Sequence, residues 1–372
     1  MLYTSFMFAS IIVFLLVLSV LVIAHEFGHF IVARKFGVLV EEFGFGLPPR
    51  IIGKKIGETL YSINLFPFGG FVKLHGEDSN ERLKHPKRAF SIKSKKARFA
   101  IVVAGVIMNF LLAIVSFGIV YSFSGIPRDI KDVKVVEVVA GSPAQVAGLV
   151  VGDIIKKVDK NDVSKVIEFV DLVEESKGKK VQLVVERNSS EIKLNITPRV
   201  NPPEGEGPLG VVITNTEIYF PKVYLRPLWG VYYGFKEAVF WGGNIVVSLL
   251  QIIKGLFAGN VPEDIAGPVG IFAITSKAVQ YGVLAVINFV GIMSVNLAIL
   301  NILPFPALDG GRLLFIGIEK AIGRKVSPKF ESIVHTVGMI ILLFLLLAIT
   351  AHDIQRLISS GGIGGFLDSV VK

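Results

Sequence analysis

Two histidines and a glutamate near residue 25 have the types and spacing needed for metal-assisted hydrolysis. His25, Glu26 and His29 form an H-E-x-x-H pattern. Residues four apart lie on one face of a helix, so both imidazoles can share one ion while the glutamate holds a water. The pattern lies in an apolar stretch, where ionisable side chains are costly unless they have a role. It therefore predicts a zinc hydrolase that works within a membrane.

The third metal ligand is expected from a distant segment. The chain has no cysteine, so thiolate ligands are excluded and the ligand must be Asp, Glu or a further His. Asp309 is the best candidate, because it follows a later apolar segment at a depth similar to that of the histidines. Pro304 and Pro306 must interrupt helix there, which is tolerated at membrane depth where the backbone lines a cavity. Asn301, just before this break, could donate an amide hydrogen bond to an oxyanion or to substrate backbone.

Ordinary structural roles stay open for several of these residues. Asp309 could cap a helix and pair with Arg312, and Asn301 could satisfy a carbonyl that Pro304 frees. Two glycine motifs are as compatible with tight turns as with substrate contacts, and their candidate residues are Gly44, Gly46, Gly69 and Gly70. The remaining histidines are assigned no metal role: His75, His85, His335 and His352.

The composition is that of an integral membrane protein. Of 372 residues, 52% are hydrophobic and 19% are charged, with a mean hydropathy of +0.64. Four segments approach the ~20 residues that a bilayer requires, and they lie at about 5–33, 99–122, 283–304 and 333–351. A fifth apolar segment, 238–257, carries several polar residues and is interpreted as interfacial.

The charge distribution predicts an orientation. The net charge is +9, but Lys and Arg crowd beside the apolar segments, which argues against nucleic acid as a partner. Residues 34–98 hold 14 basic and 6 acidic side chains, whereas residues 124–281 hold 18 of each. The positive-inside rule therefore places 34–98 and 305–332 in the cytoplasm and the middle domain outside. Four spans fit this arrangement and bring Asp309 to the leaflet of the two histidines, whereas five do not.

The middle of the chain predicts a soluble β-rich domain. Apolar and polar residues alternate in 133–138, and a second strand-like run occupies 180–187. A proline- and glycine-rich stretch at 201–208 predicts a linker or turn after this domain.

These motifs carry a resemblance. HEFGH in the first span, with NILPFPALDGG after the third, resembles the motif pair of the site-2 protease family, and the similarity covers nearly the whole chain. The bacterial branch with one extracytoplasmic PDZ domain is the most similar. Further matches are Gly-Phe-Gly at 44–46, FGGFVKL at 68–74, GSPAQVAGL at 141–149 with GDII at 152–155, and GPVGI at 267–271.

The resemblance implies a mechanism and a set of partners. His25, His29 and Asp309 would bind Zn²⁺, Glu26 would be the general base, and Asn301 would assist in holding substrate or oxyanion. Substrates would be transmembrane segments of other proteins, such as anti-sigma factors or remnant signal peptides, cut near the cytoplasmic side of a bacterial inner membrane. Membrane lipids are further partners, and a peptide or substrate domain could bind the PDZ-like domain.

The expected fold is a polytopic α-helical membrane protein with four transmembrane helices, an inserted β-rich PDZ-like domain and a membrane-associated β-hairpin. The predicted parts are a first span at 1–34, a cytoplasmic-side loop with the hairpin at 35–98, a second span at 99–123, the PDZ-like domain at 127–202, a linker with an interfacial segment at 203–281, the third and fourth spans at 282–352 and a tail at 353–372.

Two other classes of function are alternatives to a protease. In a catalytically silent PDZ adaptor, Glu26 would have no use beside the metal. An ion transporter would carry further charged residues in its spans, yet the second span, Phe99 to Tyr121, has none.

Overall fold

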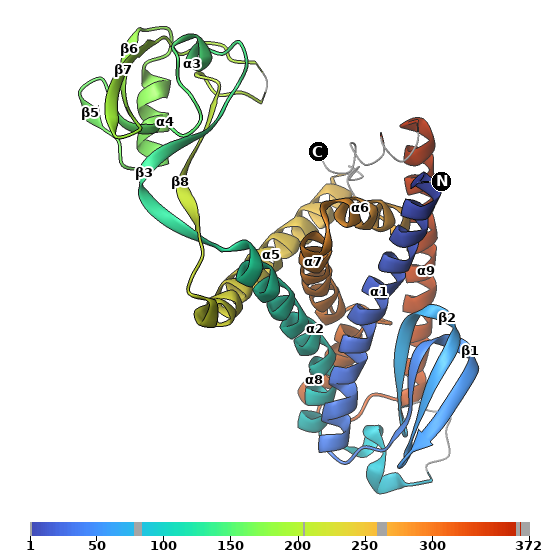
Figure 1. Ribbon diagram of the computed structural model, residues 1–372. Coiled ribbons are helices and arrows are strands. Elements are labelled where there is room, and N and C mark those ends of the chain that lie inside the picture. Colours follow the sequence, from blue (N-terminus) through green and yellow to red (C-terminus); the bar gives the residue numbers. More distant parts are fainter. Residues whose placement is uncertain (1, 78–83, 204, 259–265, 362–364, 366–372) are drawn as a thin grey trace. The chain divides into compact units, whose positions relative to one another are not determined.

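The computed structural model describes residues 2–77, 84–203, 205–258, 266–361 and 365 (Figure 1). Its contacts divide the chain into two units. Unit 1 comprises Met1–Phe123 and Tyr224–Lys372, and unit 2 comprises Ser124–Val223.

Unit 1 is mainly helical, because its sequence consists of long apolar runs rich in Leu, Ile and Val. The helices are α1 (Leu2–Lys35), α2 (Lys95–Ser124), α5 (Arg226–Phe257), α6 (Pro268–Tyr281), α7 (Val283–Ile302), α8 (Asp309–Ile322) and α9 (Pro328–Ser359). Short 3₁₀ turns occupy η1 (Pro86–Arg88), η2 (Phe90–Ile92) and η3 (Val223–Leu225). Proline at the first turn of α6 and of α9 fits there, because the N–H that it lacks has no helical partner at that position.

Five helices among the described residues are long and apolar enough to cross a membrane, one more than the four spans predicted. Four of them correspond to the predicted spans: α1, α2, α7 and α9. The additional helix is α5, the least apolar of the five, which begins a dozen residues before the predicted segment 238–257. The chain is therefore a multi-pass membrane protein, and α6 is a further helix inside the predicted linker.

Helices α1 and α2 are antiparallel neighbours (Figure 1). Near the C-terminal end of α1, a Cβ on Gly28 would lie 2.3 Å from the carbonyl oxygen of Ala104 near the start of α2. At the other end of α1, the Ser276 hydroxyl of α6 donates to Ser10, with the oxygens 3.1 Å apart. Helix α6 also contacts α9, where the Gly270 N–H donates to Asp353 over 2.9 Å.

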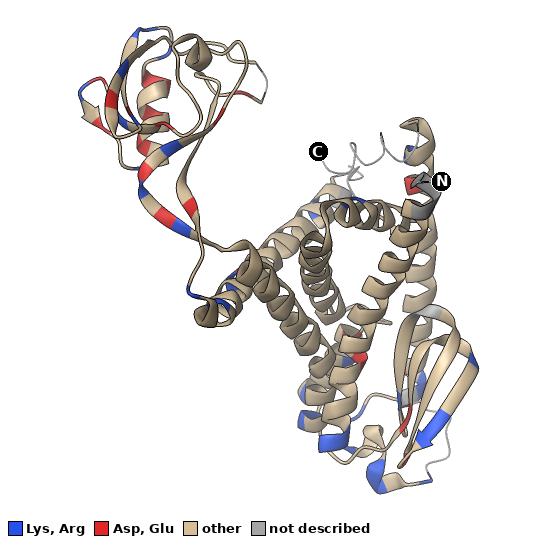
Figure 2. Ribbon diagram, in the orientation of Figure 1, with Lys and Arg blue, Asp and Glu red and all other residues tan. Residues whose placement is uncertain are grey.

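Lysines and arginines gather at the end of unit 1 where α1 ends and α2 begins (Figure 2). Most are exposed, but Arg98 is buried and forms an ion pair with Glu319 of α8, which is 3% exposed. The backbone N–H of Val326 also donates to this carboxylate, and Lys95 donates to the Glu319 carbonyl. The ion pair therefore fixes α8 against α2.

The predicted hairpin is a small antiparallel sheet of two long, irregular strands, β1 (Val40–Ile56) and β2 (Thr59–Leu74). The strands pair more than once: Phe43 opposes both Val72 and Tyr61. The register therefore gives four segments in the order 50–56, 59–64, 40–45 and 70–74. Segment 70–74 pairs only with β1 in this register, so it is an edge of the sheet, and it lies beside α1.

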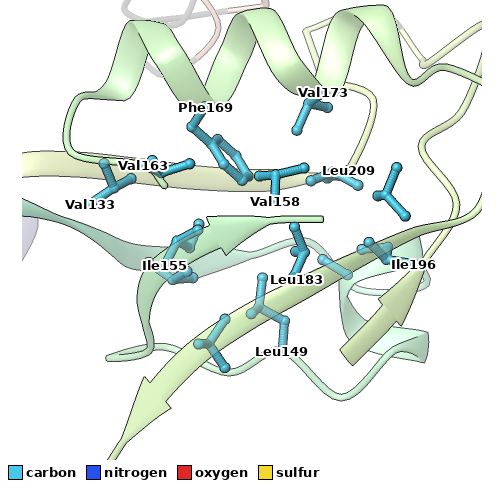
Figure 3. Close-up of a cluster of buried hydrophobic side chains, with 14 residues drawn as sticks. Val133, Leu149, Ile155, Val158, Val163, Phe169, Val173, Leu183, Ile196 and Leu209 are labelled. Carbon is cyan, nitrogen blue, oxygen red and sulfur yellow. The ribbon is translucent and has the colours of Figure 1, made fainter. Parts of the chain in front are cut away.

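Unit 2 is one antiparallel sheet with helices packed on it. The strands are β3 (Ile126–Val138), β4 (Ile154–Val158), β5 (Asn161–Asp162), β6 (Val181–Arg187), β7 (Ser190–Ile196) and β8 (Val211–Tyr219), in the order β7-β6-β4-β3-β8, with β5 beside β4. The helices are α3 (Pro143–Val146) and α4 (Val166–Glu175). Alternate strand positions such as Val133, Ile155 and Leu183 are fully buried and pack under Phe169 of α4 (Figure 3).

This unit extends beyond the predicted 127–202. The segment predicted as a linker leads into β8, which pairs along β3 from Ile126↔Tyr219 to Val138↔Val211. Strand β8 follows a proline- and glycine-rich turn, and its partner β3 is the first strand of the domain. The residues near β8 in the sequence do not reveal a partner so far away along the chain. Burial by itself would raise the pKa of the Asp153 carboxyl, but the carboxylate accepts two hydrogen bonds from Arg187 and one from the Val150 N–H. Together with the Arg187 charge, these bonds hold the pKa of Asp153 below its usual value.

Candidate metal centre and active site

Three potential ligand atoms converge where α1 meets α8. One helical turn separates His25 from His29 on α1, and their Nε2 atoms are 3.2 Å apart. Asp309 is the first residue of α8, and its Oδ2 lies 3.0 Å from His25 Nε2 and 3.1 Å from His29 Nε2. Among the described residues, these three form the one group of His, Asp and Glu side chains whose ligand atoms lie close enough to share a metal.

The geometry of these atoms fits a zinc ion. Zn–N and Zn–O bonds of about 2.0–2.1 Å at tetrahedral angles place neighbouring ligand atoms about 3.3 Å apart. The three observed separations, 3.0–3.2 Å, are close to that value. The Asp309 Oδ2 is buried and, among the residues that the structure describes, makes no hydrogen bond of acceptable geometry, although both rings are near it. A shared metal ion would satisfy this oxygen and both nitrogen lone pairs.

The far nitrogen of each imidazole has a partner on α2. The His29 Nδ1–H donates to the Ile101 carbonyl over 2.8 Å, which leaves the lone pair of its Nε2 available for a metal. The Asn109 amide lies 3.2 Å from His25 Nδ1, and the Asn109 Oδ1 is buried with no hydrogen-bond partner in the described part of the chain. A half-turn of that amide brings Oδ1 to the Nδ1–H, so Asn109 can fix the same tautomer in His25.

Small residues allow α2 to approach the ligands this closely. A Cβ on Gly105 would lie 2.5 Å from His29 Nε2 and 2.7 Å from His25 Cε1. Gly28 performs the same role on α1, against the backbone of Ala104. The metal-facing surface of α2 is therefore shaped by a glycine directly beneath the two rings.

The break after α7 presents Asp309 to the histidines. Helix α7 ends at Ile302, and the chain turns through Leu303–Leu308 before α8 begins. A Cβ on Gly310 would lie 1.9 Å from the Leu303 carbonyl oxygen, so only glycine permits this tight return of the chain. Arg312 forms its ion pair with Glu77, which follows the small sheet, whereas the Asp309 Oδ2 lies beside the two histidines.

Two hollows border the ligands. A cavity of about 880 Å³ is lined by Glu26, His29 and Asp309 together with residues of β2, α8 and α9. A smaller pocket of about 250 Å³ is lined by His25, Glu26, Asn301 and Asp309. Glu26 therefore lines both hollows, and Asn301 lines the smaller one.

The four candidate glycines have different environments. Gly46 and Gly69 have φ values of +79° and +94°, which are turn conformations that favour glycine. A Cβ on Gly44 would lie 2.4 Å from the ring of Phe71, so Gly44 makes room for that ring. Gly70 lies beside the active site, since a Cβ there would lie 3.8 Å from Glu26 Cγ. Gly70 is therefore the member of this set nearest to the chemistry.

Two residues of this region were missed by the sequence analysis. Asn109 could have been noticed as a polar side chain in an otherwise apolar span, because such groups require a partner in the membrane. His335 of α9 was assigned no role, yet its Nδ1 accepts the Ala307 N–H over 3.0 Å, two residues before Asp309. Both signals were present, but neither indicates a partner that lies elsewhere in the sequence.

Apolar helices that hold two histidines, an aspartate and an adjacent glutamate around a hollow define a membrane-embedded metallohydrolase. The sequence pattern described as peptidase family M50 matches residues 13–345. The chain belongs to this family, which confirms the resemblance to site-2 proteases and the prediction of a peptidase.

Several relatives are similar in sequence to this chain over nearly their full lengths. A protein of Clostridium perfringens is 34% identical over 340 residues, which are 91% of this chain and 97% of that protein. The zinc metalloprotease RasP of Oceanobacillus iheyensis is 30% identical over 437 residues, with 94% of this chain and 99% of that protein covered. RasP of Geobacillus kaustophilus is 30% identical over 425 residues, with 93% and 98% covered. Among solved structures, the PDZ domain of an SdrC-like protein of Listeria monocytogenes matches 23% of this chain and 92% of that chain, with 23% identity and a TM-score of 0.21.

Proposed function

We propose that this protein is a zinc-dependent intramembrane endopeptidase that cleaves transmembrane segments of other membrane proteins. The observation that carries the proposal is the convergence of His25, His29 and Asp309 within 3.2 Å of one another, beside Glu26, on apolar helices. Zinc as the metal is supported by the donor set, two imidazoles and one carboxylate, and by the names of the two RasP relatives.

The chain's own residues divide the chemistry of peptide hydrolysis. Zinc held by His25, His29 and Asp309 would lower the pKa of a water towards ~7 and polarise the scissile carbonyl. Glu26 accepts the proton that the attacking water loses and returns it to the leaving amine. Asn301, which lines the smaller pocket, donates its amide N–H to the carbonyl oxygen of the substrate as negative charge develops there.

An extended substrate is the form that this site can cut, because a helix hides its carbonyls. The edge segment 70–74 of β2 lies beside α1, and Phe71, Val72 and Leu74 line the large cavity together with Glu26. A substrate segment that adds as a strand to this edge would present its carbonyls towards the site. Gly70 would contact it, whereas Gly44, Gly46 and Gly69 would act by shaping the sheet.

Four spans remain our proposal, with α5 inclined along one leaflet rather than crossing. Helix α5 begins beside the C-terminal end of α2, where the Ser122 hydroxyl donates to the Arg226 carbonyl. After α5 the chain reaches α6, which contacts Ser10 near the N-terminal end of α1. Because α1 and α2 are antiparallel, these two ends belong to the same side, so the path from α2 to α6 is consistent with α5 returning to it.

The orientation follows from the same arrangement. The basic residues at the end of α1 and the start of α2 support placing the active site towards the cytoplasm, where they would also contact anionic lipids. Unit 2 would then be extracytoplasmic, and its single sheet with α4 supports the interpretation as one PDZ-like domain that gates or binds substrate. Membrane-anchored anti-sigma factors and remnant signal peptides in a bacterial inner membrane are the proposed substrates.

The proposal is tested with the full chain purified in detergent and a single-span reporter peptide. Wild type should bind about one zinc per chain and cut the peptide, and a chelator should abolish cutting until zinc is restored. Glu26→Gln should retain zinc and lose cleavage, whereas His25→Ala and Asp309→Ala should lose both. Cleavage by metal-free His25→Ala would refute the mechanism. Bound zinc without cleavage of any single-span peptide would favour the adaptor, and absence of zinc would favour the transporter.

A further inference from the structure

The turn that carries Asp309 contains a strained residue. Ala307 has a φ of +75°, and it is the one residue other than glycine with a positive φ in the described part of unit 1. An L-residue in this left-handed region is destabilised, because its Cβ crowds the following carbonyl. Such a conformation persists where surrounding groups hold it. Ala307 lies two residues before Asp309, so its conformation affects where α8 begins.

Helix α9 supplies a specific contact to this residue. The backbone N–H of Ala307 donates to Nδ1 of His335, with 3.0 Å between the nitrogens. The His335 ring packs on Phe315 of α8, with ring centroids 5.7 Å apart. The other ring nitrogen, Nε2, is buried without a partner among the described residues. The bond to Ala307 is therefore the polar contact that fixes this ring in the described structure.

A second observation shows how closely α9 covers the turn. A Cβ on Gly338 would lie 2.4 Å from Cβ of Pro306 and 2.7 Å from its carbonyl oxygen. Gly338 lies three residues after His335 in α9, which is about one helical turn. Both residues therefore face the Pro306–Leu308 segment. The space at Gly338 lets α9 come near enough for the His335 ring to reach the Ala307 N–H.

We propose that His335 is a positioning residue for the metal centre. Its hydrogen bond holds the Pro306–Leu308 turn in the conformation that points Asp309 at the two histidines. The inference rests on the proposed metal centre. His335 is not one of the three ligands, and its hydrogen bond is to Ala307, two residues before Asp309. It acts by compensating the left-handed backbone of Ala307, so its removal should loosen the turn and weaken metal binding.

Four variants separate positioning from simple packing. His335→Leu keeps an apolar side chain but removes the acceptor, whereas His335→Asn keeps an acceptor at nearly the place of Nδ1. Ala307→Gly removes the cost of a positive φ, so it should rescue His335→Leu in the double variant. Thr336→Val is the matched control. Thr336 lines the large cavity, as His335 does, but its hydroxyl donates within α9, to the Ser332 carbonyl.

The first readout is the zinc dissociation constant of the full chain in detergent, measured by chelator competition. His335→Leu should weaken binding by about 10-fold, the scale found when a residue that supports a ligand is lost. His335→Asn and Thr336→Val should stay within about 2-fold of wild type, and Ala307→Gly should recover about 5-fold in the His335→Leu background. Wild-type affinity in His335→Leu would overturn the proposal. A loss that neither the asparagine nor the glycine variant relieves would also overturn it, because packing alone would then explain the effect.

The second readout needs no metal. Backbone amide exchange across 303–311 in the metal-free protein should be faster in His335→Leu than in wild type, and unchanged in Thr336→Val. Unchanged exchange in His335→Leu would refute the positioning role. Failure of wild type to bind zinc would instead refute the metal centre of the proposed function, and the exchange experiment would still decide whether His335 holds the turn.

Discussion

Replacing Gly105 by alanine should damage the metal centre without touching any ligand. The new Cβ would lie 2.5 Å from His29 Nε2 and 2.7 Å from His25 Cε1. Ordinary contacts of this kind are about 3.5–4.0 Å, so one or both rings would have to retreat by about 1 Å. Metal sites tolerate shifts of about 0.2 Å. The rings cannot retreat freely, since Ile101 and Asn109 hold their far nitrogens.

The expected size of the effect follows from overpacking. Inserting a methyl group into a filled site costs about 1–3 kcal/mol, which corresponds to a loss of zinc affinity of about 5-fold to 150-fold. Alanine favours helix over glycine by up to about 1 kcal/mol, so α2 itself should not unfold. Weakened zinc binding with little change in thermal stability is therefore the expected pattern.

The assay is chelator competition for zinc in detergent, together with cleavage of the reporter peptide. Gly317→Ala is the matched control, because Gly317 lies in α8 and a Cβ there would meet nothing within 4 Å. The control should keep wild-type affinity and activity. If Gly105→Ala binds zinc within 2-fold of wild type, the close packing of α2 on the two rings is not as described.

Three further predictions address other parts of the molecule. Glu319→Ala should lower the free energy of unfolding by about 3–5 kcal/mol, because it leaves the buried Arg98 charge unpaired. Thermal unfolding in detergent tests this, and a loss of less than about 1 kcal/mol would contradict it. Asn109→Leu should weaken zinc binding by about 10-fold through loss of the partner of His25, whereas retention of wild-type affinity would show that the ring needs no such anchor. Asp153 has a lowered pKa in the fold, so its contribution to the stability of unit 2 is complete above about pH 4 and is lost as the pH falls further through the folded pKa. Amide exchange of the full chain should therefore show Asp153→Asn less protected than wild type in unit 2 at pH 7, with the difference shrinking below pH 4, and a difference that does not depend on pH would refute this linkage.

Local patterns in the sequence predicted the parts that depend on local physics. The spacing of His25 and His29 places two imidazoles on one face of any helix, and long apolar runs predicted α1, α2, α7 and α9. Asp309 was selected because the chain lacks cysteine and because charge bias predicted that it lies in the leaflet of the two histidines. The convergence of these atoms within 3.2 Å agrees with that selection.

Local patterns in the sequence did not predict how the strands of the two sheets pair. A hairpin was expected within residues 35–98, but β1 and β2 bend so that Phe43 pairs on both sides, and no local periodicity encodes a second partner. For the same reason β8 was read as part of a linker, although it pairs with β3 some 80 residues earlier.

The sequence by itself determined the class of the protein, because an H-E-x-x-H helix in apolar surroundings and a distant aspartate follow from composition, spacing and charge. Only the tertiary structure decided which side chains support those ligands. Asn109, Gly105 and His335 act through atoms far apart along the chain, and their contacts exist only once α2 and α9 pack against the site. Helical periodicity is a local property, whereas packing between helices depends on the fit of whole surfaces.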